Sequence, residues 1–471
     1  MLKNLKILRP VLALLILFIP LYPKFPLSSV KGTYVAIRLD DIIVSIAIVI
    51  WVIYQLKHRL PIIKLKISQL FIAYFLAIIA STINAILVYQ TDPINILVLH
   101  LIRRFEYMAL FFITIDAIKT KKDLLFPYIF LLVATVSVTV YGYGQKYLEF
   151  PVVSTMNSEF SKGQLLQMDI WTRINSTFAG HYDLAAYLSV VLIIIGCAFV
   201  ISKNKYLKIA SLLAWLPAFQ IFTFTASRIS TFSFWGAIVL TLFLIRKYLW
   251  IIPVSAIVIF SIMNSKDLNQ RLLATIPSIA GIFQAKATVT PLPTITIAAP
   301  TPQVIVTVIP TPTIIIVATP IPTIFRHPPI DEFIPVDSDV GVVRSGEIRF
   351  NAEWPRAISA YSKNYLVGTG LGSITLATDN DYLRLLGESG LLGFISFMAI
   401  IVYFIVRSIP SVFRKQQTTL DIINLILLGG LIATLANAMF IDVFEASKTA
   451  YTFWIMMGIF YQSLALNVKK S

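Results

Sequence analysis

Long apolar stretches alternate with short polar, mostly basic segments along this chain. A helix needs roughly 20 apolar residues to cross about 30 Å of hydrocarbon, because each residue adds about 1.5 Å. Stretches near this length lie at 7–22, 40–56, 67–89, 95–117, 124–143, 183–201, 207–224, 230–246, 248–263, 390–407, 421–440 and 447–466. The pattern predicts an all-α polytopic membrane protein with about twelve transmembrane helices.

Basic residues gather in every second connection between the predicted spans. The clusters contain Lys57, Arg59, Lys64 and Lys66; Lys119, Lys121 and Lys122; Lys203, Lys205 and Lys208; Arg246 and Lys247; and Arg407, Arg414 and Lys415. Cytoplasmic loops are enriched in Lys and Arg, so these connections and both termini are predicted to face the cytoplasm. Within 95–117, Arg103, Arg104 and Glu106 must be paired or face a cavity, because unpaired charge in lipid is costly.

Two connections on the opposite side are long, at 144–182 and 264–389. The second divides the chain into a membrane domain at 1–263 (spans one to nine), an extracytoplasmic loop domain at 264–389, and a membrane domain at 390–471 (spans ten to twelve). Inside this loop, a Thr/Pro-rich insertion at 287–325 carries no charge and repeats a Pro-x-Pro unit. Repeated prolines exclude a helix, so we expect an extended spacer without a role in chemistry.

Composition supports a multi-pass protein of the cell (cytoplasmic) membrane. The chain is 57% hydrophobic and only 13% charged, whereas soluble proteins are about 25% charged. Its net charge of +16 lies in short clusters between apolar runs, which favours membrane lipids rather than nucleic acid as the partner. Cys197 is the single cysteine and the four histidines are scattered, so neither an intramolecular disulfide nor a zinc site is expected.

The segment Ser345–Gly393 changes character and carries a series of polar and glycine motifs. In order, these are Arg349 and Trp354, then Gly368-Thr369-Gly370-Leu371-Gly372, then Asp379-Asn380-Asp381-Tyr382-Leu383, then Glu388-Ser389-Gly390. The three glycines predict a tight turn. They are no dinucleotide fingerprint, because no strand–helix unit follows them.

These elements, in this order and between late spans, resemble the O-antigen ligase and polymerase family of bacterial envelope glycan assembly. Thr225–Arg228 at an outer helix end and Arg173–Tyr187 before the sixth span add to the likeness. The resemblance covers most of the chain except the insertion. One departure is Asp379, which stands where ligases of the family typically have a histidine.

The resemblance implies transfer of a glycan from an undecaprenyl-diphosphate carrier to a hydroxyl of a glycan or lipid acceptor, on the outer face of the membrane, without a metal or cofactor. It implies three catalytic residues, which are Asp379, Arg228 and Arg349, and four substrate-binding residues, which are Arg173, Asn380, Trp354 and His181. Arginine suits the leaving diphosphate because its planar fork binds phosphate oxygens bidentately. Asp379 would take the proton of the acceptor hydroxyl.

Structural roles would explain the same residues. Arg228 could contact lipid headgroups, Arg349 could be an exposed helical arginine, and Trp354 could serve packing. Asp379 could cap the helix that begins near Tyr382, with Asn380 as a second cap candidate.

Other functions also remain open. A lipid-linked oligosaccharide flippase or other transporter would predict inverted repeats. A membrane glycosyltransferase that uses polyprenyl-phosphate sugars would depend on Asp40 and Asp41. A non-enzymatic envelope protein would explain the Thr/Pro-rich insertion.

Overall fold

The protein is described from a computed structural model, which covers residues 2–23, 25–29, 36–89, 93–153, 165–166, 173–265, 348–374 and 378–468. The insertion predicted at 287–325 and most of the loop predicted at 264–389 lie outside the described residues. The apolar runs predicted from the sequence all form helices.

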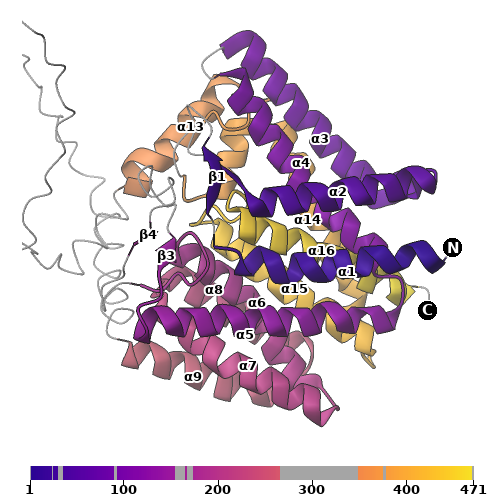
Figure 1. Cartoon of the computed structure of the whole chain (residues 1–471), viewed down its shortest axis with the longest axis vertical. Helices are drawn as coiled ribbons and strands as arrows, with labels where there is room; N and C mark the ends of the chain where they lie inside the picture. The colour runs from indigo at the N-terminus through magenta and orange to yellow at the C-terminus, as the bar shows by residue number, and fades with distance from the viewer. Residues whose placement is uncertain are drawn as a thin grey trace, which may run out of the picture.

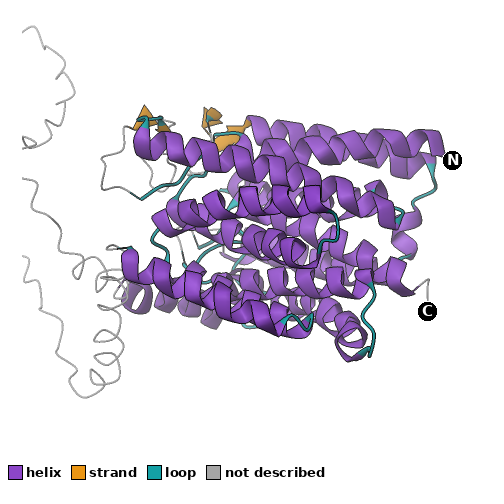
Figure 2. Ribbon diagram, turned by 90° about the horizontal axis from the view of Figure 1, so that it is seen from below, coloured by secondary structure: helices purple, strands orange, loops and turns teal. Residues whose placement is uncertain are grey.

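Long α-helices packed side by side make up the body of the protein (Figures 1 and 2). They are α1 (Leu2–Leu21), α2 (Leu39–Lys57), α3 (Lys66–Asn84), α4 (Ile94–Ala117), α5 (Leu125–Tyr147), α6 (His181–Ile201), α7 (Lys205–Phe224), α8 (Arg228–Leu244), α9 (Ile251–Asn264), α14 (Asp381–Phe413), α15 (Thr419–Ala438) and α16 (Ser447–Val468).

Short elements lie between the long helices. Two antiparallel strand pairs join β1 (Pro26–Ser29) to β2 (Ala36–Arg38) and β3 (Val152–Val153) to β4 (Leu165–Leu166). A π-helical turn, η7 (Arg349–Glu353), leads into the short helix α13 (Trp354–Lys363). Further turns lie at η1 (Pro61–Lys64), η2 (Ala85–Tyr89), η3 (Lys121–Leu124) and η5 (Tyr248–Trp250).

The helices identify a multi-pass membrane protein. Among the described residues, 7 helices are long and apolar enough to cross a membrane: Leu39–Lys57, Lys66–Tyr89, Lys121–Tyr147, His181–Ile201, Lys205–Phe224, Asp381–Phe413 and Thr419–Ala438. Shorter apolar helices are Ile7–Leu21, Arg228–Leu244 and Tyr248–Asn264. The runs predicted at 95–117 and 447–466 are α4 and α16, which belong to neither group.

Aromatic side chains fill the centre of the bundle, where α4 and α16 pack against each other and against α3 and α14. Phe71 of α3 stacks on Phe111 of α4 with ring centroids 4.7 Å apart, and meets Trp454 of α16 edge-on at 5.4 Å. Aromatic pairs of this kind add stability beyond their buried area.

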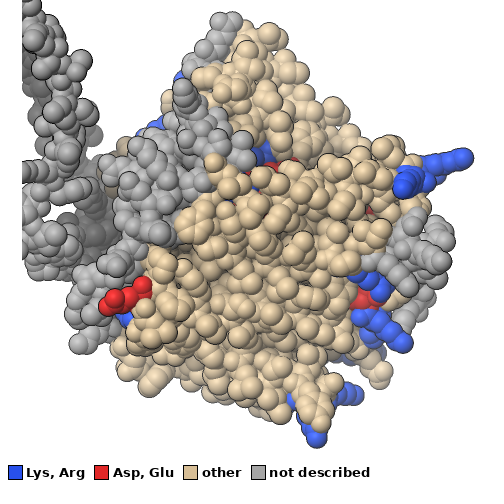
Figure 3. Space-filling view, viewed as in Figure 1, with Lys and Arg blue, Asp and Glu red and all other residues tan. Residues whose placement is uncertain are grey.

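The two ends of the bundle differ in their surface. We call the end where α1 begins and α16 ends the basic end; Lys57, Lys121, Lys203, Arg246 and Lys415 are exposed or half-buried there. Blue side chains stand out from this side of the surface in Figure 3. We call the opposite end, which carries α13, η7 and both strand pairs, the loop end (Figure 1).

Candidate functional site

The site is built around a break in α14 at the loop end. Gly390 has φ 63° and ψ −168°, which are not helical values. The backbone N–H groups of Leu391 and Leu392 donate instead to the carbonyls of Tyr365 and Leu366, at 2.9 and 3.1 Å. The part of α14 before Gly390 is therefore a short separate helix, held against the loop that follows α13.

The three glycines of that loop form the tight turn predicted from the sequence, with φ values of +71°, +104° and +81° at Gly368, Gly370 and Gly372. Thr369 N–H donates to the Gly387 carbonyl at 3.0 Å. A Cβ added at Gly368 would lie 2.5 Å from the carbonyl carbon of Glu388. Only glycine permits this approach without strain, so the loop and the broken helix form one rigid support.

Arg349 and Asp379 meet on this support. The Nε and Nη2 atoms of Arg349 lie 2.9 and 2.7 Å from Oδ2 of Asp379. The Arg349 side chain is 9% exposed and that of Asp379 is 29% exposed. The structure therefore joins two of the predicted catalytic residues in one ion pair. Arg349 is a buried arginine, so the alternative of an exposed helical arginine is wrong.

The backbone at Asp379 is held in an unusual conformation. Asp379 has φ 49°, in the left-handed region that costs energy for a residue with a Cβ. On either side, the N–H groups of Thr378 and Asn380 donate to the carboxylate of Asp442, at 2.9 and 3.2 Å. Asp442 therefore fixes the backbone on both sides of Asp379, and the Asp379 side chain is directed towards Arg349.

Asn380 caps the helix. Its Oδ1 accepts a hydrogen bond from Leu383 N–H at 3.0 Å, and α14 begins at Asp381. The structural alternative for Asp379, a helix cap, is wrong because its carboxylate is engaged by Arg349. The role predicted for Asn380 was substrate binding; the structure places this side chain in the cap, where it is largely buried.

Neighbouring groups change the pKa of Asp379. Burial raises the pKa of Asp379 above its ordinary value, Arg349 opposes this, and Asp442 adds to it. The carboxylates closest in sequence are engaged elsewhere: Asp381 accepts from Phe444 N–H at 3.1 Å, and Glu388 lies 3.4 Å from Arg384.

Further ion pairs link this support to the connection between α15 and α16. Arg384 Nη2 lies 3.4 Å from Oδ2 of Asp442, and Arg104 of α4 pairs with Glu445. Burial acts to raise the pKa of Glu445, but Arg104 and Arg384 hold it below its ordinary value. Arg103 lies 3.4 Å from Asp41. The expectation of pairing is therefore confirmed for Arg103 and Arg104. For Glu106 it is not, because its Oε1 is buried without a hydrogen-bond partner among the described residues.

A second group of predicted residues lies where α6 and α8 begin. Arg173 Nη1 is 2.7 Å from Nε2 of His181. Arginine can only donate, so this nitrogen of His181 accepts and the imidazole ring is neutral. Ala226 has φ 49°, and Ser227 caps α8 by accepting from Ser230 N–H at 3.4 Å. This tight turn sets Arg228 at the start of α8.

The two groups lie near each other. Arg228 interacts electrostatically with Arg349, with Arg173 and with Tyr182, and Arg349 also interacts with Tyr182. Three segments far apart in sequence therefore place Arg228 within reach of the charges of both Arg173 and Arg349 at the loop end.

Trp354 occupies a packing position. Its ring lies 4.7 Å from Phe350 and 6.1 Å from Phe440, measured between centroids. Its indole N–H is buried without a hydrogen-bond partner among the described residues. This placement agrees with the packing alternative and leaves the predicted substrate contact as a prediction.

Glu353, which none of the sequence motifs includes, lies beside the Arg349–Asp379 ion pair. One of its carboxylate oxygens, Oε2, is buried without a hydrogen-bond partner in the described part of the chain. Burial and the nearby Asp379 raise the pKa of Glu353 to about 7, although Arg349 opposes this. The signal was present, because Glu353 follows Arg349 by four residues, a spacing that places both on one helix face.

No group of three or more His, Cys, Asp and Glu residues within the described ranges is arranged to hold a metal ion. A comparison with protein-family models finds no match to the chain, and a comparison with curated proteins finds none either. A functional hypothesis must therefore be argued from the residues of the loop end.

Proposed function

We propose that the protein is a glycan transferase of the O-antigen ligase and polymerase type. One observation carries this proposal: at one end of a membrane bundle, Arg349 pairs with Asp379 beside Glu353, and Arg228 lies within reach of the charges of both Arg349 and Arg173. Cations for a leaving diphosphate and carboxylates for an acceptor proton are the two kinds of group that such a transfer requires.

In the proposed reaction, an acceptor hydroxyl attacks the anomeric carbon of a glycan linked to undecaprenyl diphosphate. The new glycosidic bond forms as the bond to the diphosphate breaks, and the diphosphate leaves with the bonding electrons. Arg173 and Arg228 stabilise the negative charge on the leaving group, because preorganised cations cost no reorganisation during the reaction.

Asp379 and Glu353 together take the hydroxyl proton in this proposal. Arg349 holds one oxygen of Asp379, whereas Oε2 of Glu353 has no hydrogen-bond partner among the described residues. A pKa of about 7 for Glu353 suits a base that works near neutral pH. Because the two carboxylates interact, they titrate as a pair.

The proposed topology has about twelve spans, with the basic end in the cytoplasm and the loop end outside the cytoplasmic membrane. The exposed and half-buried lysines and arginines of the basic end support this orientation. Reporter fusions after Ser265 and after Lys415 should report opposite sides of the membrane. The same side for both would overturn the topology.

Transfer can be tested with the full chain in vesicles that contain an undecaprenyl-diphosphate-linked glycan and a glycan acceptor. We expect Asp379→Asn to abolish most transfer, because the amide can neither accept the proton nor hold the Arg349 charge. Asp123→Asn is the matched control, since Asp123 is also largely buried and paired with an arginine, Arg9, at the basic end.

Three results would contradict the proposal. One is near-normal transfer by the Asp379→Asn variant, and another is equal loss in the Asp123→Asn control. The third is a wild-type chain that moves the lipid-linked glycan across the vesicle membrane without joining it to the acceptor, which is the behaviour of a flippase.

A further inference from the structure

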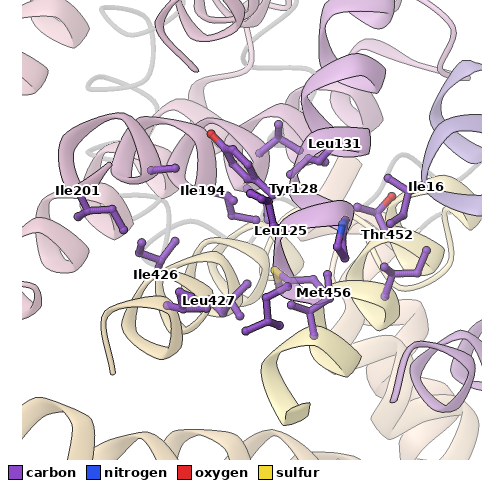
Figure 4. Close-up of a pocket in the computed structure, with 18 of the residues that line it drawn as sticks. Ile16, Leu125, Tyr128, Leu131, Ile194, Ile201, Ile426, Leu427, Thr452 and Met456 are labelled. Carbon is purple, nitrogen blue, oxygen red and sulfur yellow. The ribbon is translucent and has the colours of Figure 1, made fainter. Parts of the chain in front are cut away.

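A large apolar cavity lies in the bundle on the side of the basic end. Its volume is about 680 Å³, within the range of roughly 300–1,000 Å³ that is usual for ligand sites. Helices α1, α5, α6, α15 and α16 surround it. Side chains that point into it include Ile16, Leu131, Ile194, Ile426, Leu427 and Met456 (Figure 4).

The cavity wall offers few free polar atoms; the hydroxyl of Tyr187 is buried without a hydrogen-bond partner among the described residues, but others are engaged. Tyr128 OH and Ser211 Oγ are 2.7 Å apart, and Thr452 Oγ1 donates to the Lys448 carbonyl at 2.8 Å. A polar ligand inside the cavity would lose its own hydrogen bonds with water and gain few in return. The wall therefore suits a hydrocarbon chain.

The mouth of the cavity is different in character. Lys121, at the start of η3, and Lys203, in the turn before α7, both line it and are both exposed. The nearby carboxylate of Asp123 is neutralised by Arg9 at 2.7 Å. The mouth therefore offers two positive charges to an anionic group at the level of the basic end.

We propose that this cavity binds one chain of an anionic phospholipid from the membrane leaflet at the basic end, with the lipid phosphate between Lys121 and Lys203. An apolar channel with cations at its mouth is complementary to a phospholipid, because the hydrocarbon chain and the phosphate match the two regions. The proposal is independent of the proposed transferase function, because Arg349 and Asp379 lie at the loop end.

The test uses the full chain reconstituted in phosphatidylcholine vesicles with a minor share of phosphatidylglycerol. Lipid that stays bound through detergent extraction is identified by mass spectrometry of the intact protein. We expect wild-type protein to retain phosphatidylglycerol preferentially. The variant Lys121→Gln/Lys203→Gln should lower this preference by about fivefold for each lysine removed.

Two matched pairs of variants distinguish lipid binding in the cavity from lipid binding elsewhere on the surface. Lys122→Gln/Lys205→Gln removes the same charge from residues that do not line the cavity, and should retain phosphatidylglycerol as the wild type does. Ala198→Phe places a ring in the cavity and should abolish retention of either lipid. Ala210→Phe, on the exposed face of α7, should change nothing.

The proposal fails if Lys122→Gln/Lys205→Gln loses as much phosphatidylglycerol as the mouth variant, since the effect would then be one of surface charge. It also fails if Ala198→Phe retains lipid normally. Recovery of a polyprenyl diphosphate from wild-type protein in its native membrane, displaced by Ala198→Phe, would assign the cavity to a donor lipid instead.

Discussion

The loop end and the basic end both carry many charged residues, but they use them in opposite ways. At the loop end, Arg104, Arg349 and Arg384 are in ion pairs with side chains only 9 to 10% exposed. At the basic end, Arg9 pairs with Asp123 yet remains 45% exposed. The same type of side chain is thus a structural and chemical element at one end and a solvated surface charge at the other.

The difference follows from the cost of moving charge out of water. A buried arginine loses its hydration and must recover the energy from a partner in fixed geometry, whereas an exposed one keeps its hydration. The arginines of the loop end therefore need partners in fixed positions, whereas Arg9 at the basic end keeps much of its hydration even in its ion pair.

The largest effect is expected from Arg104→Ala, which leaves Glu445 beside other buried carboxylates. We expect a loss of about 3–5 kcal/mol in the free energy of unfolding. Arg9→Ala at the basic end should cost less than about 1 kcal/mol, because that arginine is nearly half exposed. Denaturant unfolding in detergent measures both. Equal losses would remove the distinction between the two ends.

A smaller loss is expected from Gly368→Ala, which forces a Cβ into a left-handed position against Glu388. Strain of this kind lowers the free energy of unfolding by about 1–3 kcal/mol. The hydrogen bonds between this loop and the broken α14 should also weaken. Gly236→Ala is the control, because a Cβ there meets nothing within 4 Å. Because Gly236 lies within α8, Gly236→Ala should raise the free energy of unfolding by about 0.5–1 kcal/mol. A neutral Gly368→Ala would show that the loop is not rigid.

Replacement of one cation by another should matter only at the loop end. Arg228→Lys keeps the charge but loses the planar fork, and we expect a fall of about tenfold in glycan transfer. Lys203→Arg at the basic end should leave transfer unchanged. Initial rates in vesicles compare the two. If both variants transfer normally, Arg228 acts only as a point charge.

The smallest effect concerns pH. The pKa of Glu353 is raised to about 7, so this carboxyl is protonated below that pH and cannot accept a proton. Transfer should therefore increase as the pH rises through about 7 and level off above it. In Glu353→Gln, we expect lower transfer rates and no such rise with pH. A rise that persists unchanged in the variant would exclude Glu353 from the proton transfer.

Helix positions could be predicted well because apolar length is a local property. The predicted run at 183–201 and the observed α6 (His181–Ile201) differ by two residues at one end. The start predicted at 390 for the tenth span coincides with the break at Gly390, because glycine follows polar Glu388 and Ser389 there. Local sequence signals are sufficient for features of this kind.

The candidate site was predictable only in part. Arg349 and Asp379 were selected separately, but nothing in the sequence showed that they pair with each other. Asp442 was missed, because it reaches Asp379 only after α15 and α16 have packed beside α14. From the sequence, Asp379 and Asn380 are both cap candidates, since two adjacent residues of similar capping strength cannot be told apart without the backbone. In the structure, Asn380 is the cap.

The Arg104–Glu445 pair also bears on how the protein is made. Its two residues are separated by 341 positions, so Arg104 is synthesised long before its partner. Until the α15–α16 connection has left the ribosome, the loop end lacks both Glu445 and Asp442, and the backbone beside Asp379 is not yet fixed. Contacts of such high sequence separation form late. The nascent protein therefore carries an incomplete site throughout most of its synthesis, and the site matures only when the last helices have been inserted.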